Sequence, residues 1–405
     1  RTQEEKGLLM LDLDSVISYC EGIVESGEDS AVLQAMNDSI AALELGEEKT
    51  AQYQEQLRTA FSDSFLSAYQ DILDTMRELQ SSGENNEQGL AQFEYGKEYY
   101  ALLLQQSIGS NKTPEEVKAM MEEAFNEHLQ QLQMYAMAYP EETEQVLSQD
   151  LPKTGYTSYD EILQDLQGKI FDSFPQVEDL SYQIEDVNEE IASDSGVAAY
   201  FNIPSLDGDT VKQLRVNPNN AGVDSIDTFS TVAHEGFPGH MYQYAYMYEN
   251  IDSNFIKALA NVGAYTEGFA VYAQYESLQY LEGISQELLD VYREYELLTY
   301  CLVIAADIGI HYEGWSLQEF EDYFTEMGLS IGSGDALYQQ LQANPAVFET
   351  YYVGYHEIMD LREKAEDALG NAFDEKAFNE ALLESGTAPF SVVERHIDAY
   401  IESAS

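Results

Sequence analysis

Apolar residues recur every three to four positions along most of the chain, in segments rich in Leu, Ala, Glu, Gln and Tyr. This spacing gathers apolar side chains on one face of an α-helix. Only nine prolines interrupt the pattern, and several segments begin with a Ser or Thr followed three residues later by Glu, as at Thr113 and Ser316. Such a capping box satisfies free N–H groups at a helix start. The pattern therefore predicts a mainly α-helical protein.

One region has the character of a sheet instead. Residues 198–204 and 211–217 contain β-branched and aromatic side chains and flank a turn-forming connector, Ser-Leu-Asp-Gly-Asp at 205–209. We expect a small β-hairpin here. Its edge either pairs with an extended peptide by strand addition or is purely structural.

Turn-forming stretches suggest how the chain is organised. The polar stretch 81–89 separates helical segments, and Leu-Pro-Lys-Thr-Gly at 151–155 makes a second break. We therefore expect an N-terminal helical region over residues 1–150 and a catalytic region over 151–405, within one continuous folding unit. A chain of 405 residues is long enough to bury a large core.

The strongest chemical signal is the segment 231–240, which holds two of the six histidines and a glutamate beside the first of them. Neutral imidazole is a common zinc ligand, as His234 and His240 would be. A carboxylate next to a ligand, here Glu235, is placed to take a proton from metal-bound water. The segment therefore predicts the metal site of a zinc hydrolase.

The six-residue spacing of these histidines differs from the four-residue spacing of the helical His-Glu-x-x-His motif. Six positions of regular helix would turn the second histidine roughly 120° from the first. Pro238 lacks the N–H that a helix needs, and Gly236 and Gly239 accept unusual backbone angles. Either two residues bulge out and restore a one-turn relationship, or the segment is simply a turn between two helices.

A third ligand stands further along the chain. Glu267 lies near the start of a predicted helix, and a catalytic zinc takes three protein ligands with one open position. A structural alternative is a carboxylate that interacts with the helix dipole. Glu276, on the same segment, either supports the metal ligands from behind or belongs to a solvated helix face.

These motifs resemble the DUF885 family of bacterial proteins. The resemblance covers most of residues 195–405 and, more weakly, residues 96–130. It rests on His-Glu-Gly-Phe-Pro-Gly-His, Glu-Gly-Phe-Ala, Asp-Ile-Gly-Ile-His-Tyr-Glu-Gly-Trp-Ser and Tyr-Tyr-Val-Gly-Tyr, with Leu361-Arg362. Glu-Gly-Phe-Ala is also similar to the second motif of gluzincin metallopeptidases, where the glutamate binds zinc. The chain departs from the family pattern at Tyr300 and Val303, where the family has arginines, and this leaves substrate preference open.

Further candidates lie downstream. Asp307 and His311 are four residues apart, which suits a carboxylate that orients an imidazole. His311 would then stabilise an oxyanion or bind substrate, unless it is a buried structural histidine. Tyr351 is a second oxyanion donor, although tyrosines most often pack. Arg362 either clamps a peptide carboxylate or pairs with a glutamate.

The charge balance narrows the choice of partners. With 75 acidic and 18 basic residues, the net charge is −57, so a phosphate backbone would be repelled and nucleic acid is excluded as a partner. This surface either keeps the protein soluble or attracts cations and basic peptides. No apolar run is long enough to span a membrane. The chain starts at Arg1, so we expect a processed extracytoplasmic protein, secreted or lipid-anchored, whose targeting segment is absent from this sequence.

Taken together, these observations predict a zinc-dependent peptidase that acts on short peptides. His234, His240 and Glu267 would bind Zn²⁺, and Glu235 would act as general base. One alternative is a catalytically silent extracytoplasmic peptide-binding protein of the same fold. Another is metal-dependent hydrolysis of a non-peptide amide or ester.

Overall fold

A computed structural model describes the chain except for residues 84, 188–197, 207–210, 221, 330–333 and 405. The protein is mainly helical and carries one small three-stranded sheet, which confirms the predicted fold class. Part of the connector expected at 205–209 lies outside the described residues. No described helix is long and apolar enough to cross a membrane.

The chain divides into two compact units. The first comprises Arg1–Glu87, Asp186–Val197 and Val216–Asn220. The second comprises Gln88–Glu185, Ala198–Arg215 and Ala221–Ser405, and it contains every residue for which the sequence suggested a chemical role. The division of roles predicted at residue 150 stays a prediction.

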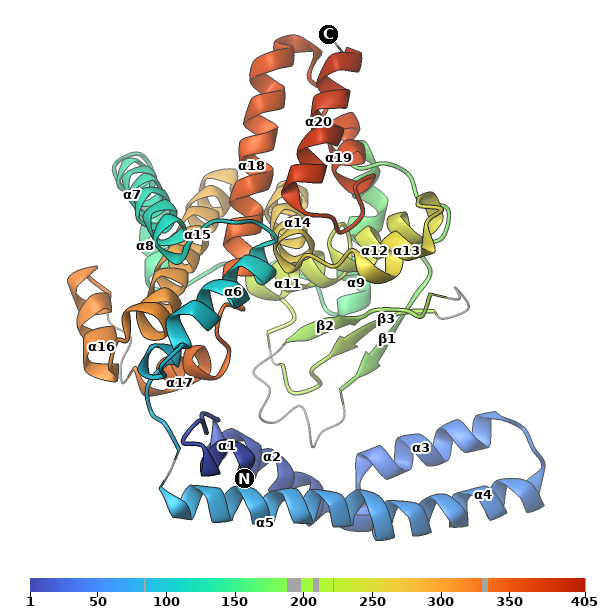
Figure 1. Ribbon diagram of the computed structural model, residues 1–405. Helices are drawn as coiled ribbons and strands as arrows, with labels where there is room; N and C mark the ends of the chain where they lie inside the picture. Colours follow the sequence, from blue (N-terminus) through green and yellow to red (C-terminus); the bar gives the residue numbers. More distant parts are fainter. Residues whose placement is uncertain (84, 188–197, 207–210, 221, 330–333, 405) are drawn as a thin grey trace. The chain divides into compact units, whose positions relative to one another are not determined.

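Helices make up most of the described part of the first unit. Its helix α2 packs against α5, and α3 packs against α4. A π-helical segment, Phe61–Leu66, joins α4 to α5 without a break, so that the three form one long rod (Figure 1). Buried Leu9, Leu13 and Leu79 form a small core. The helices are α1 (Thr2–Glu5), α2 (Leu13–Ser26), α3 (Ala31–Ala42), α4 (Glu47–Ala60) and α5 (Ser67–Ser82).

The second unit holds the remaining helices and the sheet. Its helices are α6 (Gly96–Ile108), α7 (Pro114–Ala138), α8 (Pro140–Leu147), α9 (Tyr159–Lys169), α11 (Ile226–Glu235), α12 (His240–Asn250), α13 (Asn254–Leu259), α14 (Gly263–Glu276), α15 (Gln286–Ile308), α16 (Leu317–Glu326), α17 (Asp335–Ala343), α18 (Glu349–Leu369), α19 (Glu375–Leu383) and α20 (Phe390–Ala404).

Local sequence fixes several of these helix starts. Thr113 forms a complete capping box with Glu116 at the start of α7, and Ser316 forms one with Glu319 at the start of α16. Each box satisfies N–H groups that have no partner within the helix. The predicted breaks also hold, because α5 ends at Ser82 and residues 151–155 lie between α8 and α9.

The sheet lies in the order β1-β3-β2, with β1 (Tyr182–Asp186), β2 (Ala199–Asn202) and β3 (Lys212–Val216). Neighbouring β2 and β3 form the expected pair, while β1 was not predicted from the sequence. The order leaves β2 at an edge of the sheet. Helix α11, which follows the sheet in the chain, packs against β2.

Helix α14 is the centre of the second unit, with ten of its fourteen residues buried. It packs along α18 and also contacts α11 (Figure 1). The approach to α18 is close where Gly268 faces Gly354, because a Cβ at Gly354 would lie 1.7 Å from the carbonyl oxygen of Ala264. Only residues without side chains let the two backbones come this near.

The two cysteines behave as buried apolar groups. Cys20 and Cys301 are both buried and free, so no disulfide joins them. Burial raises the pKa of both thiols, to about 12 for Cys301. Neither is a reactive thiolate at neutral pH.

Candidate metal centre

The histidine motif spans a break between two helices. Helix α11 ends at Glu235 and α12 begins at His240. The chain turns so tightly that the N–H of Gly239 donates to the carbonyl of Ala233, and a Cβ at Gly239 would lie 1.9 Å from the carbonyl oxygen of His234. Glycine is therefore required there. The segment is therefore a turn between two helices, and this turn brings the two histidines together.

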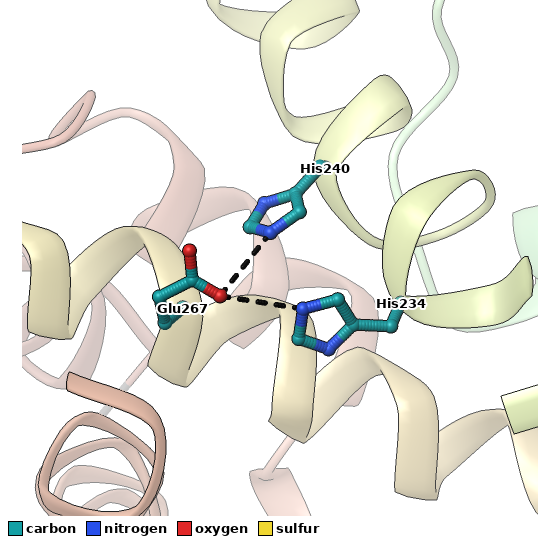
Figure 2. Close-up of side chains that lie close together, drawn as sticks. All are labelled: His234, His240 and Glu267. Atoms are coloured by element: carbon teal, nitrogen blue, oxygen red, sulfur yellow. Dashed lines mark ion pairs between the residues drawn. The ribbon is translucent and has the colours of Figure 1, made fainter. Parts of the chain in front are cut away.

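Glu267 completes the group from α14. Its Oε2 lies 3.3 Å from Nε2 of His234 and 3.4 Å from Nε2 of His240 (Figure 2). The two imidazole rings are nearly perpendicular, with centroids 4.8 Å apart. One ligand atom from each residue can be chosen so that all three lie within 4.8 Å of one another. The structure thus brings together the three predicted ligands.

This geometry fits a metal ion better than a set of hydrogen bonds. The two separations from Glu267 Oε2 exceed an ordinary charge-assisted hydrogen bond, and this buried oxygen has no hydrogen-bond partner among the described residues. Zinc binds such ligands at about 2.1 Å, which places neighbouring ligand atoms of a tetrahedron roughly 3.4 Å apart. The His–Glu separations agree with that value.

The charges at the group favour a cation as well. Burial would raise the pKa of Glu267, but the contacts with His234 and His240 outweigh burial and hold this pKa well below its ordinary value. For His240, burial would lower the pKa, while Glu267 and then Glu235 raise it. Glu267 is therefore a carboxylate across the physiological pH range, and its negative charge can bind a metal ion.

A glutamine orients one of the histidines. The side-chain oxygen of Gln274 lies 3.2 Å from Nδ1 of His234. Because an amide oxygen only accepts, Nδ1 carries the proton and Nε2 is left to bind a metal. Gln274 follows Glu267 by seven residues, about two helical turns, so α14 provides both a ligand and a ligand's support from one face. The sequence analysis did not identify Gln274.

Glu235 is held by the edge strand. The backbone N–H of Phe201, in β2, donates to Oε2 of Glu235 at 2.8 Å. This bond fixes the carboxylate beside the ligand that precedes it in the sequence. The predicted general base therefore has a fixed orientation, and a backbone group from a strand provides it.

Tyr351 also lies at the metal centre. Its ring stacks on His234 with centroids 6.0 Å apart, and it also stacks on Tyr300 with centroids 6.1 Å apart. Burial, followed by the charges of Glu267 and Glu235, raises the pKa of Tyr351, so its hydroxyl keeps the proton that a donor needs. Among the oxyanion candidates, this is the one that the structure puts beside the ligands.

The similarity to known proteins can be judged against this geometry. Residues 7–397 match the model of a family described as "Bacterial protein of unknown function (DUF885)". The chain belongs to the DUF885 family. No curated protein matches the sequence.

Two solved structures share the fold of this DUF885 chain. A "putative lipoprotein from Colwellia psychrerythraea" superposes with a TM-score of 0.84 at 20% identity, covering 99% of this chain and 72% of that one. A "putative lipoprotein of unknown function from Shewanella oneidensis" gives a TM-score of 0.61 at 17% identity, covering 94% of this chain and 72% of that one. These similarities confirm the fold. The chemistry has to be argued from the residues of the site.

The DUF885 motif around His311 lies in the buried interior of the second unit. His311 is fully buried, and its Nδ1 accepts from the N–H of Leu90 while its Nε2 donates to the carbonyl of Leu341. Asp307 lies further away, with Oδ1 3.7 Å from Nε2. Both ring nitrogens are thus bound by the protein's own backbone. The arrangement supports the structural interpretation of His311 and gives no support to a role in binding substrate.

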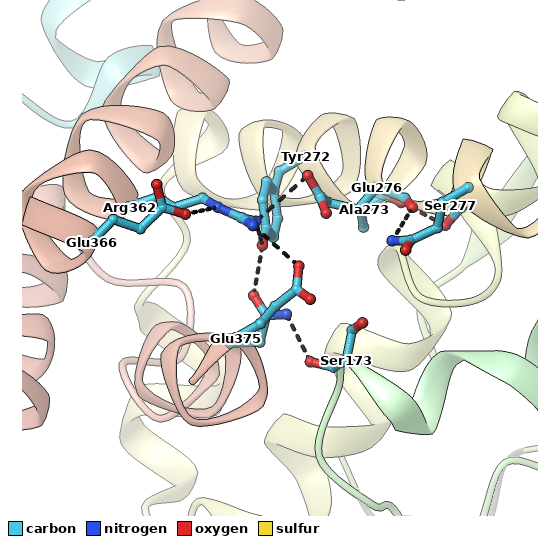
Figure 3. A network of polar contacts seen from close by, with 10 residues as sticks. Ser173, Tyr272, Ala273, Glu276, Ser277, Arg362, Glu366 and Glu375 are labelled. Carbon is cyan, nitrogen blue, oxygen red and sulfur yellow. Dashed lines mark hydrogen bonds and ion pairs between the residues drawn. The ribbon is translucent and has the colours of Figure 1, made fainter. Parts of the chain in front are cut away.

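Arg362 has become part of an ion-pair network. Its guanidinium lies 2.9 Å from Glu366, 3.3 Å from Glu375 and 3.5 Å from Glu276, and it donates to the hydroxyl of Tyr272 (Figure 3). The predicted alternative, pairing with glutamates, is the one that the structure supports. A carboxylate clamp would need a guanidinium that these groups do not already hold.

The same network accounts for Glu276. This residue follows Glu267 by nine positions, about two and a half turns, so it leaves α14 on the opposite face. Burial raises its pKa to about 7, and the charge of Arg362 partly offsets that shift. Glu276 therefore balances Arg362 rather than supporting the metal ligands.

Proposed function

We propose that this DUF885 protein is a zinc-dependent peptidase that hydrolyses short peptides. The observation that carries the proposal is the carboxylate of Glu235, which the strand amide of Phe201 holds beside three converging ligands. A group that only bound metal or peptide would not need such a carboxylate. This argument favours an enzyme over a silent peptide-binding protein.

Each residue of the centre then has a distinct part. His234, His240 and Glu267 would hold the ion. When bound, zinc would polarise the scissile carbonyl and lower the pKa of a water molecule. With Oε2 of Glu235 fixed by a hydrogen bond, Oε1 is the atom that takes a proton from water and returns it to the leaving amine. The hydroxyl of Tyr351 would donate to the oxyanion.

The edge position of β2 supports a peptide as substrate. Phe201 already uses its N–H to hold Glu235, so this strand runs beside the proposed base. An extended peptide laid along a free strand edge gains backbone hydrogen bonds without side-chain specificity. Amides and esters that cannot extend along the strand would lack this contribution, so a peptide is favoured over a non-peptide substrate.

We also propose an extracytoplasmic location for this chain. Two proteins of the same fold are each described as a "putative lipoprotein", and the strongly acidic composition is compatible with a highly solvated surface.

The deciding test is Glu235→Gln. This change keeps the size of the side chain and removes its ability to accept a proton, so zinc content should stay near one per chain while peptide hydrolysis falls at least about a hundredfold. Cleavage of a mixed peptide library by zinc-loaded protein, followed by mass spectrometry, measures the effect.

A matched control is Glu282→Gln, which makes the same change at a side chain that is 88% exposed. It should leave hydrolysis as in the parent protein. Equal cleavage by the Glu235→Gln variant would remove Glu235 as the base. No cleavage by the parent would put the peptide-binding alternative first.

A further inference from the structure

A row of side chains on α15 leads away from the metal centre. Tyr292, Glu296 and Tyr300 are spaced four residues apart and so share one face of the helix. At one end of the row, Tyr300 stacks on Tyr351, which itself stacks on His234. The charge of the metal ligand Glu267 also acts on the Tyr300 hydroxyl and contributes to its raised pKa, after burial, Glu296 and Tyr351. The row therefore begins beside the ligands.

Glu296 is the acidic member of this row, and no cationic side chain among the described residues pairs with it. It is half-buried and forms no hydrogen bond or ion pair within the described part of the chain. Burial, followed by the charge of Asp227, raises its pKa to about 7. The arginine on the same helix, Arg293, lies 3.5 Å from each of Asp290 and Glu294 instead. A protein gains nothing in stability from such a carboxylate, because its burial is uncompensated.

A second polar group without a partner among the described residues belongs to α14. Tyr275, on α14, is only 4% exposed, and its hydroxyl has no hydrogen-bond partner among the described residues. Burial raises the pKa of this hydroxyl first, and the charges of Tyr300 and Glu296 raise it next. Tyr355 of α18 packs edge-on against the Tyr275 ring at 6.0 Å. The charge of Glu296 thus acts on tyrosines of two helices, Tyr275 of α14 and Tyr300 of α15.

We propose that Glu296 is a specificity-determining residue that binds an organic cation of the substrate, either a terminal ammonium group or the side chain of a lysine or arginine. This inference rests on the proposed function for its role in selecting substrates. A cation there would pair with the carboxylate and donate to the hydroxyl oxygen of Tyr275, which has no hydrogen-bond partner among the described residues.

The distance suits a short peptide. The ring centroids of His234 and Tyr351 lie 6.0 Å apart, those of Tyr351 and Tyr300 lie 6.1 Å apart, and Glu296 lies one helical turn from Tyr300 on α15. These steps set an upper limit on the separation, and because an extended chain advances about 3.3 Å per residue, roughly five residues are enough to span it. A long lysine side chain would shorten the peptide that is needed.

The test compares charged and neutral pentapeptides that are otherwise the same. One set carries lysine or norleucine at a single position, and each peptide is made with a free or an acetylated amino terminus. Binding is measured by calorimetry on zinc-loaded Glu235→Gln protein, so turnover is not required. The parent should prefer the cationic peptide by roughly tenfold to a hundredfold, as expected for a charge-assisted contact. Lysine dependence identifies the side chain as the source, and loss on acetylation identifies the terminal ammonium.

Adding Glu296→Gln should bring the cationic and neutral peptides to near parity while zinc content and neutral-peptide affinity stay unchanged. Glu287→Gln makes the same change in charge at an exposed position of α15 and should keep the preference. No preference in the parent background, or a preference that survives Glu296→Gln, would overturn the inference.

The peptidase proposal has a separate readout, which is hydrolysis by protein with Glu235 intact. Cation binding that depends on Glu296 without any hydrolysis would leave the recognition site standing and remove the peptidase. Hydrolysis without cation preference would support the peptidase and remove the recognition site at Glu296.

Discussion

The second unit contains two groups of histidines and carboxylates, one at the candidate metal centre and one around His311. They are built from the same residue types, but their geometry suits different roles. At the metal centre, Nε2 of His234 and Nε2 of His240 point at one carboxylate oxygen at distances too long for good hydrogen bonds. Around His311, both ring nitrogens are bound by backbone groups. A histidine that is ready for a ligand thus keeps one nitrogen free of the protein. A histidine that holds the fold together does not.

The carboxylates differ in the same way. The pKa of Glu267 is depressed by its imidazole neighbours despite burial, so the group stays charged and attracts a cation. Burial raises the pKa of Asp307 to about 6, and that of Glu349 well above its ordinary value. The hydroxyl of Tyr100 lies 2.8 Å from a carboxyl oxygen of each. A single phenolic proton cannot satisfy both acids, so this pair retains a proton of its own.

The largest expected effect separates the two groups by metal affinity. His240→Ala or Glu267→Ala should weaken zinc binding on the order of a thousandfold, because a three-ligand site becomes a two-ligand site. His311→Asn should keep one zinc per chain, although it lowers stability. Competition with a chelator, followed by elemental analysis, measures both. Parent-like zinc affinity in Glu267→Ala would place the metal elsewhere.

The next effect concerns the pH dependence of stability. Because folding raises the pKa of Asp307, the folded protein keeps a proton that the unfolded chain releases near pH 4. The stabilisation that this proton provides is complete below about pH 4 and is lost as the pH rises through about 6. Asp307→Asn mimics the protonated acid and should reduce the loss between pH 4.5 and 8 by on the order of 1–3 kcal/mol.

Urea unfolding at the two pH values measures this difference. The exposed substitution Asp367→Asn serves as the control and should leave the pH profile as it is. An unchanged profile in Asp307→Asn would show that the buried pair is ionised throughout.

The smallest expected effect tests the support of the metal centre. Gln274→Leu removes the acceptor of the His234 Nδ1 proton and should weaken zinc binding roughly tenfold. Gln274→Glu keeps an acceptor and should restore most of the affinity. Gln279→Leu, on an exposed side chain after the end of the same helix, should change nothing. If all three variants bind zinc alike, the ring of His234 is oriented by packing alone.

The three candidate ligands could be predicted from the sequence because histidine is rare in it. Only six histidines occur in the chain, so two within seven positions form a signal. The helical character was accessible for a similar reason, since its apolar period repeats over long segments. Strand β1 escaped because it has five residues, of which three, Gln183, Glu185 and Asp186, are polar.

The remaining features depend on contacts between distant residues. The amide of Phe201 leaves no mark in the sequence, because every residue except proline has one. The roles of His311 and Arg362 were set by partners such as Leu341 and Glu375, which only the fold brings near. Glu296 was one acidic residue among 75, in a chain with 30 tyrosines. A residue type that occurs so often gives no signal in the sequence, whereas the few histidines do.

The close crossing of α14 and α18 has a consequence for reading other chains of this family. Gly268 follows the ligand Glu267 directly, and its counterpart Gly354 lies three residues after Tyr351. The two glycines set the spacing between α14 and α18, and this spacing lets Tyr351 stack on His234. A relative that keeps all three candidate ligands but carries larger residues here would need a wider spacing between the two helices. The pair thus offers a criterion, independent of the ligands, for deciding which family members can share a substrate.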